Sequence, residues 1–248
     1  MNRIKLSPLA TSPVAKPASQ TASRSTLFTS DKQATSAEQE TCLFGPLQYE
    51  KHYAYPLIVW LHSDGQKSDQ LQSILPKISM QNYVGVAPQG AVGNFQCGYH
   101  WDQDFDSIQA AQESVFAAIE MACSRFNIAK NRIFLAGLGG GGTMALRIAM
   151  NQPDDFAGVI ALNGPMPVGH SILSRWKEAR QLPVFWAQHK ASQGETSAAA
   201  MSRNFQQLFS FGFMNLVARE YPTLSDLEGL APREVNKWIM EQVETAIL

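Results

Sequence analysis

Residues 132–149, which read RIFLAGLGGGGTMALRIA, carry the most distinctive chemical pattern in the chain. A short apolar run ends at Gly137, four successive glycines follow from Gly139, and the apolar spacing from Thr143 onward predicts a helix packed on a sheet. The backbone amides of such a strand–turn–helix junction can bind phosphate. The glycines from Gly137 to Gly142 also satisfy the Gly-x-Gly-x-x-Gly spacing of nucleotide-binding proteins. Nucleotide binding through this turn is therefore one hypothesis.

Two features of the surrounding sequence disfavour nucleotide binding. A dinucleotide-binding fingerprint follows the first strand of its unit, and an acidic residue closes the next strand. Here several predicted strands precede the glycines, and the next predicted strand ends in Leu162-Asn163-Gly164. Glycines that fill a tight turn explain the pattern more simply, and we expect no cofactor.

A residue that attacks a carbonyl carbon needs a side-chain heteroatom, and Gly139, at the centre of the turn, has none. Other residues carry suitable groups, although each also has a simpler interpretation as a residue of a turn, a helix start, a strand end or a loop. The candidates are Ser63, Thr143 and Cys97 as nucleophile, His62, His100 and His189 as base, and Asp102 and Asp104 as acid.

Alternating strands and helices must position these residues. Near-continuous apolar runs predict strands buried on both faces, and apolar residues spaced three or four apart predict helices between them. The alternation predicts an α/β fold with a doubly wound, mostly parallel sheet and right-handed crossovers. We expect strands over 55–62, 83–88, 132–137, 156–162, 182–187 and 214–218, and helices over 69–78, 108–126, 143–149, 198–209 and from Pro232, where proline suits a helix start.

Three segments lie outside this alternation. Residues 41–50 suit an edge strand or hairpin, and the long stretch 89–106, rich in glycine and aromatic side chains, is expected to be a functional loop or lid. Residues 1–40, rich in Ser, Thr, Ala and Pro, predict a disordered tail, in which Leu27 and Phe28 are candidates for a short strand at the domain edge. The expected organisation is a tail, 1–40, followed by one α/β domain, 41–248.

Composition and charge exclude several classes of function. A chain of 248 residues that is 45% hydrophobic can bury one large core, and a net charge of −1 gives no electrostatic footprint for nucleic acid. Three scattered cysteines are too few for a disulfide framework or a zinc site, so we expect no metal. No apolar run approaches the roughly 20 residues of a membrane span, and no signal-peptide pattern is present. We therefore expect a cytoplasmic protein.

From Tyr55 to its end, the chain resembles the phospholipase/carboxylesterase branch of the α/β-hydrolases, which includes acyl-protein thioesterase-like enzymes. The matching segments have the order and spacing of that family. They are 56–62 (PLIVWLH), 132–137 (RIFLAG) with 141–145 (GGTMA), 156–160 (FAGVI), 182–185 (LPVF) and 221–222 (YP). The resemblance implies an α/β-hydrolase fold and, for active members, hydrolysis of carboxylic esters.

Members of that family carry a Ser-Asp-His triad, and other residues occupy the matching positions here. The nucleophile elbow of the family reads Gly-x-Ser-x-Gly, and Gly139 takes the place of the serine. The acid position falls on Gln193 or Ser192, depending on the alignment, and neither side chain ionises. The base position is Ser225, in the stretch that matches Tyr-Pro-x-x-His-x-Leu. The resemblance therefore implies a triad whose three roles are all vacant.

The resemblance also places an oxyanion hole, formed by backbone amides, beside the elbow. The family's His-Gly-x turn corresponds to His62-Ser63-Asp64, so amides near Asp64 and Gly140 are expected to converge. A carboxylate pointing into this hole would oppose the binding of negative charge. We expect the Asp64 side chain to point outward, as an ordinary turn residue.

We interpret the chain as a catalytically inactive α/β-hydrolase that serves as a binding or regulatory module, because triad residues act as a unit. A small apolar or acyl-like ligand or a protein partner is compatible with this interpretation. The alternatives are an ester or thioester hydrolase with relocated catalytic residues, and a nucleotide-binding protein. The expected ligand-binding residues are Ser63, Asp64, Gly139, Gly140, His100 and Trp101.

Overall fold

A computed structural model describes residues 41–94, 96–169, 175–190, 205–206, 208–210 and 212–245. All of them belong to the larger of the two units into which the chain divides, Thr35–Leu248. The predicted tail 1–40, with its candidate strand at Leu27 and Phe28, and most of the predicted helix 198–209 lie outside the described residues.

A seven-stranded sheet with the order β1-β3-β2-β6-β7-β8-β9 forms the centre of this unit. All neighbouring strands are parallel except β1, which is the predicted edge strand and pairs antiparallel with β3. The chain adds strands on one side of β2 and then crosses to the other side at β6, so the predicted doubly wound α/β fold is confirmed. The strands are β1 Cys42–Phe44, β2 Tyr55–Leu61, β3 Val84–Ala87, β6 Ile128–Leu138, β7 Gly158–Leu162, β8 Val184–His189 and β9 Leu216–Tyr221.

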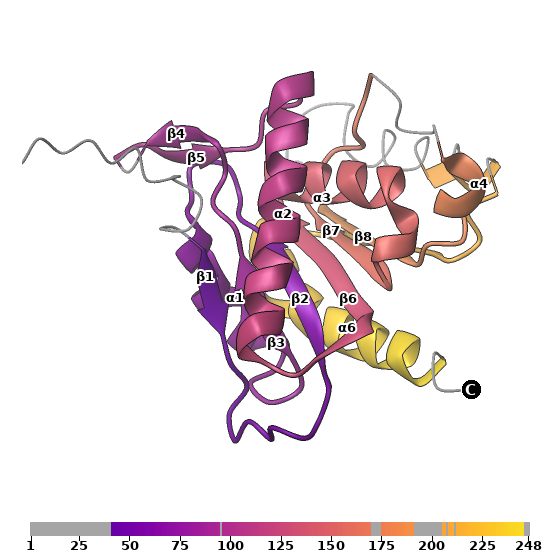
Figure 1. Cartoon of the computed structure of the whole chain (residues 1–248). Helices are drawn as coiled ribbons and strands as arrows, with labels where there is room; N and C mark the ends of the chain where they lie inside the picture. Colours follow the sequence, from indigo (N-terminus) through magenta and orange to yellow (C-terminus); the bar gives the residue numbers. More distant parts are fainter. Residues whose placement is uncertain are drawn as a thin grey trace, which may run out of the picture. The chain divides into compact units, whose positions relative to one another are not determined.

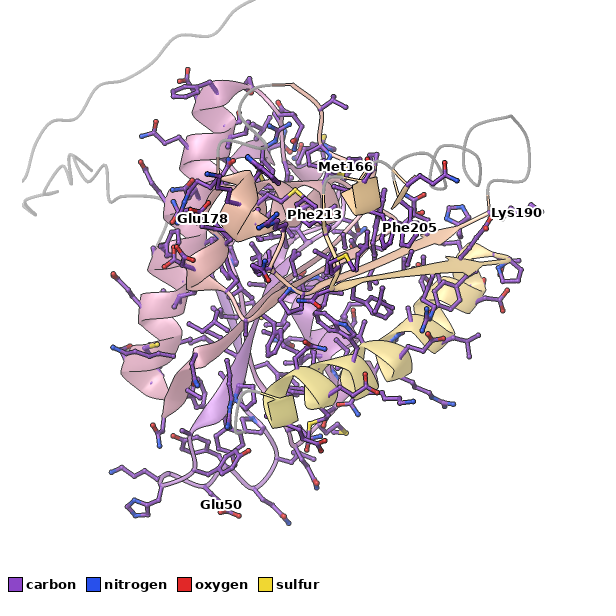
Figure 2. All side chains as sticks on the ribbon, turned by 90° about the vertical axis from the view of Figure 1, so that its right-hand side faces the viewer. Glu50, Met166, Glu178, Lys190, Phe205 and Phe213 are labelled. Carbon is purple, nitrogen blue, oxygen red and sulfur yellow. The ribbon has the colours of Figure 1, made fainter. Side chains whose placement is uncertain are left out.

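Helices cover both faces of the sheet, with α2 and α3 on one face and α1 and α6 on the other (Figure 1). Successive side chains of the fully buried β2 alternate between two hydrophobic clusters: Val59 packs on the side of α2 and α3, and Trp60 on the side of α1 and α6. Met166 and Phe213, labelled in Figure 2, pack with the cluster on the α3 side. The helices are α1 Leu71–Ile78, α2 Phe105–Arg125, α3 Gly140–Asn151, α4 Trp176–Ala179 and α6 Leu224–Thr245, with short 3-10 helices η1 Ser68–Gln70 and η2 Pro153–Asp155.

The stretch predicted as a loop, 89–106, is more ordered than expected, which corrects that prediction. It contains an antiparallel hairpin of β4 Val92–Asn94 and β5 Gly98–His100, and α2 begins at Phe105. Gly98 has a φ of 76°, and a Cβ there would overlap the backbone of Gly65. The hairpin is too short to produce the alternating apolar pattern by which a sequence reveals a strand.

The last helix begins eight residues before the predicted start. α6 begins at Leu224, and Pro232 lies inside it rather than at its first turn. Thr223 stabilises this earlier start, because its hydroxyl accepts a hydrogen bond from the Asp226 backbone N–H and donates one to the Asp226 carboxylate. Leu227 is buried with the α6 side of the core, so packing outweighs the lost hydrogen bond at the proline. Among the described residues, no helix has the length and apolar character needed to cross a membrane.

Candidate functional site

The predicted strand–turn–helix junction forms at the carboxyl end of β6, where the strand order reverses. Gly139 is the residue between β6 and α3, and its backbone has φ 58° and ψ −127°. Its N–H donates to the Leu162 carbonyl (2.8 Å), and its own carbonyl accepts from the Thr143 N–H (3.1 Å). This conformation is costly for a residue with a side chain, so glycine relieves strain at the sharpest point of the turn.

The framing glycines are required by close backbone packing. A Cβ on Gly137 would overlap the backbone of Gly141, and a Cβ on Gly141 would overlap the carbonyl oxygens of Leu61 and His62. These contacts bring the first turn of α3 directly against the ends of β2 and β6. The glycines at both ends of the Gly-x-x-x-Gly frame therefore belong to the fold itself.

Space for a side chain does exist at Gly139. A Cβ there would meet only the Asp64 carboxylate oxygen Oδ2 and the Ser63 Cβ, both at 3.7 Å, which is ordinary van der Waals contact. Sterics alone would therefore admit a serine at this position. The turn between β6 and α3 keeps its backbone geometry, and Gly139 places no side-chain atom in the adjoining space.

The Asp64 side chain points into the elbow, so the expectation that it points outward is wrong. Its Oδ2 accepts a hydrogen bond from the Gly140 N–H (3.0 Å), the amide that follows the elbow position. Its Oδ1 lies 3.7 Å from His100 Nδ1, a separation at which the two form an ion pair when the imidazole is protonated. A carboxylate thus occupies the place where the amide of an oxyanion hole would bind developing negative charge.

The turn that carries Asp64 is held from two sides, which explains its inward orientation. On one side, Gln70 accepts from the Ser63 N–H (3.0 Å) and donates to Ser63 Oγ (2.9 Å). On the other, the hairpin residue Tyr99 accepts from the Gly65 N–H and donates to the Gln66 carbonyl, both at 3.0 Å. The sequence showed a turn here but gave no sign of the hairpin that fixes it.

His62 is fully buried and is not positioned to act as a base. Its Nε2 accepts hydrogen bonds from the Gly90 N–H (3.0 Å) and the Gln89 side chain (3.1 Å), and its Nδ1–H donates to the Ser63 carbonyl (2.9 Å). Burial lowers the pKa of His62, because the neighbouring protein atoms replace the water that would solvate its charged form. The neutral ring therefore has a structural role beneath the elbow.

Trp101 lies in the core beside His62. Its indole N–H donates to the His62 carbonyl (2.9 Å), the two rings are 5.0 Å apart, and the Trp101 side chain is only 5% exposed. Of the residues predicted to bind a ligand, Trp101 thus presents almost no surface. The side chains of Asp64 and His100 are about half exposed. His100, Gly139 and Gly140 all lie close to the Asp64 carboxylate, and Gly139 also lies close to Ser63.

Two of the other candidate catalytic groups are engaged in local structure. The Thr143 hydroxyl donates to the Pro165 carbonyl (2.9 Å) and ties the segment after β7 to α3. Asp104 caps α2, where hydrogen bonds from Ser107 lower the pKa of its carboxyl group. Cys97 is exposed in the turn of the hairpin.

His189 and Ser225 lie at the carboxyl ends of neighbouring strands or just beyond them. His189 ends β8, and its Nδ1 is 2.7 Å from the Asn163 side-chain oxygen at the end of β7. Ser225, at the predicted base position, is exposed in the first turn of α6. The predicted acid positions Ser192 and Gln193 lie outside the described residues.

Sequence reasoning missed Arg147, a buried cation on α3. Its guanidinium donates to the Gln103 side-chain oxygen (2.8 Å) and to the Val168 carbonyl (2.6 Å), and only 1% of its surface is exposed. Burial lowers the pKa of Arg147. Its position between the apolar residues Leu146 and Ile148 was the available signal, and its contacts hold the segments before α2 and after β7 to α3. In the described part of the chain, no group of three or more His, Cys, Asp or Glu side chains is arranged to hold a metal ion.

Comparison with known proteins agrees with this geometry. A family model described as phospholipase/carboxylesterase matches residues 95–244, which include the elbow and the predicted acid and base positions. Among curated proteins, no sequence matches significantly.

Solved structures of several enzymes share the architecture. Acyl-protein thioesterase 2 of Zea mays is 18% identical with a TM-score of 0.58, covering 82% of this chain and 98% of its own. A carboxylesterase from Mesorhizobium loti is 16% identical with a TM-score of 0.61, covering 76% and 90%. A phospholipase/carboxylesterase from Dyadobacter fermentans is 19% identical with a TM-score of 0.56, covering 82% and 97%. At these identities the likeness shows the fold alone.

Proposed function

The chain belongs to the phospholipase/carboxylesterase family, and we propose that it is a member that does not hydrolyse esters and serves as a binding or regulatory module. The observation that carries this proposal is the glycine at the elbow. Gly139 has the sharp backbone conformation between β6 and α3 and space beside it, yet it provides no heteroatom to attack a carbonyl carbon.

The surroundings of the elbow support the same proposal. Ser225 lies in a capped first helical turn, and a hydroxyl group there has no capacity to act as the base at neutral pH. Asp64 occupies the Gly140 amide, which removes a donor from the oxyanion hole. An oxyanion hole and substrate binding without a triad leave roughly 10³–10⁴-fold acceleration over water, and here even the hole is obstructed.

The ligand that fits this proposal is small and apolar or acyl-like, or a segment of a protein partner. Ser63, Asp64, Gly139, Gly140 and His100 would contact it, since they surround the space beside the elbow. Nucleotide binding is disfavoured, because the Asp64 carboxylate already occupies the first free amide at the start of α3 and would repel phosphate.

One observation favours a second candidate, ester or thioester hydrolysis by relocated residues. The His100 imidazole faces the Asp64 carboxylate at 3.7 Å beside the elbow, and a carboxylate-oriented imidazole is the usual general base. In this candidate mechanism the nucleophile would be Ser63, whose Oγ accepts a hydrogen bond from the Gln70 side chain.

Steady-state hydrolysis of p-nitrophenyl butyrate and of a short acyl thioester separates the two candidates. We expect no saturable turnover by the wild-type protein. We expect the same result for Gly139→Ser, because Ser225 takes the place of the family's histidine and the carboxylate oxygen nearest the new hydroxyl, Asp64 Oδ2, already accepts from the Gly140 N–H. Saturable turnover that is lost in His100→Ala would instead establish the second candidate.

The variant Gly139→Leu, which fills the space at the elbow, serves as the control for location. If turnover is present and survives this block, the active centre lies away from the elbow and the proposal fails. If turnover is present and disappears with the block, the elbow is catalytic and the proposal fails as well.

A further inference from the structure

We propose that Asp64 is an internal ligand that closes the anion-binding position of the elbow, so that the protein excludes carboxylates, phosphates and other oxyanions there. This inference concerns which ligands the elbow admits. It stands whether or not the protein hydrolyses esters, so its failure is distinguishable from failure of the proposed function.

The start of α3 is a position that attracts an anion. α3 is 12 residues long, and the unpaired N–H groups and dipole of a helix N-terminus favour negative charge. The structure places an anion there, since Asp64 Oδ2 lies 3.0 Å from the Gly140 nitrogen. The occupant, however, is supplied by the chain itself from the turn that follows β2.

The glycines of the elbow make room for this carboxylate. A Cβ on Gly140 would overlap the Asp64 carboxylate, so the contact requires glycine at position 140. At Gly139, any side chain would project toward Asp64 Oδ2 and the Ser63 Cβ. The inward position of Asp64 therefore depends on glycine at position 140, and it leaves room for a Cβ at position 139.

The fold holds the carboxylate in place before any ligand arrives. Two hydrogen bonds between Gln70 and Ser63 fix the residue before Asp64, and the hydrogen bond from the Gly65 N–H to the Tyr99 carbonyl fixes the residue after it. A side chain with both neighbours fixed loses little further freedom on contacting Gly140, so closure is the resting state.

The second carboxylate oxygen is also engaged. His100, on β5, lies with Nδ1 3.7 Å from Asp64 Oδ1, so the carboxylate is held between the start of α3 and the hairpin. An incoming anion would have to displace Asp64 from Gly140 and would then lie next to a like charge. The displacement acts against every ligand that needs the Gly140 N–H, and the like charge adds a penalty for anions alone.

Anion binding to closed and opened forms tests the proposal. Butyrate and, separately, inorganic phosphate are titrated at constant ionic strength into isotopically labelled wild-type protein, Asp64→Asn and Asp64→Ala, and the Gly140 amide is followed by NMR. We expect both variants to bind about ten-fold or more tightly than the wild type, because the competing charge is gone. Asp64→Asn keeps the size of the side chain, so it remains informative if Asp64→Ala unfolds.

Asp69→Asn is the matched control, because it removes one exposed carboxylate five residues further along the chain. It should bind these anions as weakly as the wild type. Wild-type binding as tight as that of Asp64→Ala would overturn the proposal, and so would the absence of binding in all variants. Equal gains in Asp69→Asn and Asp64→Asn would show a general charge effect and would also overturn it.

Discussion

The elbow and the β9–α6 junction differ in how far they keep the frame of a hydrolase. At the elbow, Gly139 has the sharp backbone turn between β6 and α3, and it takes the place that the family resemblance gives to a serine. At the junction, where the family resemblance places a histidine in a loop, Thr223 caps a helix that begins at Leu224 and includes Ser225. The elbow is fixed by close backbone packing, whereas the junction is fixed by the hydrogen bonds of Thr223 and the burial of Leu227.

The same difference exists within the elbow itself. Gly137 and Gly141 are required because their Cβ atoms would overlap backbone, and Gly139 would meet neighbours only at 3.7 Å. Close packing therefore requires glycine at both framing positions, whereas it leaves room for a Cβ at position 139. Three predictions test the contributions of close packing, of the Asp64 contact and of the buried His62 to the stability of this site.

The largest effect is expected from Gly141→Ala. The new methyl group would overlap the carbonyl oxygens of Leu61 and His62, so α3 must shift from β2, and we expect the free energy of unfolding to fall by about 3 kcal/mol or more. Urea denaturation measures the change. The control is Gly229→Ala in α6, where nothing lies within 4 Å of the new Cβ and alanine should stabilise by about 0.5–1 kcal/mol. Equal tolerance of both substitutions would show that packing does not fix the frame.

A smaller effect is expected at Gly140, and it should depend on Asp64. Gly140→Ala overlaps the Asp64 carboxylate, so it should destabilise the wild-type protein by about 1–2 kcal/mol. In an Asp64→Ala background the overlap is gone, and the same substitution should cost nothing. A double-mutant cycle measured by urea denaturation should give a coupling of about 1–2 kcal/mol. Additive changes would contradict the contact between these two residues.

The smallest effect concerns the pH dependence that His62 gives to stability. Because burial lowers its pKa in the folded protein, the unfolded chain takes up a proton first as the pH falls below about 6.5. The contribution of the neutral ring to the free energy of unfolding is therefore complete above that pH. It decreases as the pH falls from there toward the pKa of His62 in the folded protein. We expect His62→Gln to have a shallower loss of stability between pH 7.5 and 5 than the wild type.

The control for that comparison is His52→Gln, a substitution of an exposed histidine. Its free energy of unfolding should follow the wild-type pH dependence. A wild-type slope in His62→Gln would show that the buried ring does not contribute to acid sensitivity.

The sequence predicts the sheet because its strands are buried on both faces. The run at Tyr55–Leu61 is apolar throughout, and the structure buries every residue of it. The elbow is predicted for a related reason, since only glycine allows backbone to approach as closely as at Gly137 and Gly141. An apolar run or a pair of spaced glycines reflects a requirement of its own segment, so each can be interpreted without knowing the rest of the fold.

The orientation of Asp64 depends on residues distant in the chain, so no local pattern predicts it. The carboxylate contacts Gly140, 76 residues away, and the turn is held by Tyr99 of a hairpin too short to recognise. The start of α6 was missed for a similar reason, because burial of Leu227 against the core outweighs the local signal of Pro232. Tertiary contacts decide both features.

Covalent labelling tests the central claim, that the elbow has no activated nucleophile, most directly. A fluorophosphonate reacts with the activated serine of a hydrolase to form a stable adduct. Intact mass measurement of the native wild-type protein after exposure should show no adduct beyond that found in the heat-unfolded protein. A single stoichiometric adduct on a serine or cysteine of the native protein, which does not form when the protein is unfolded before exposure, would contradict the account.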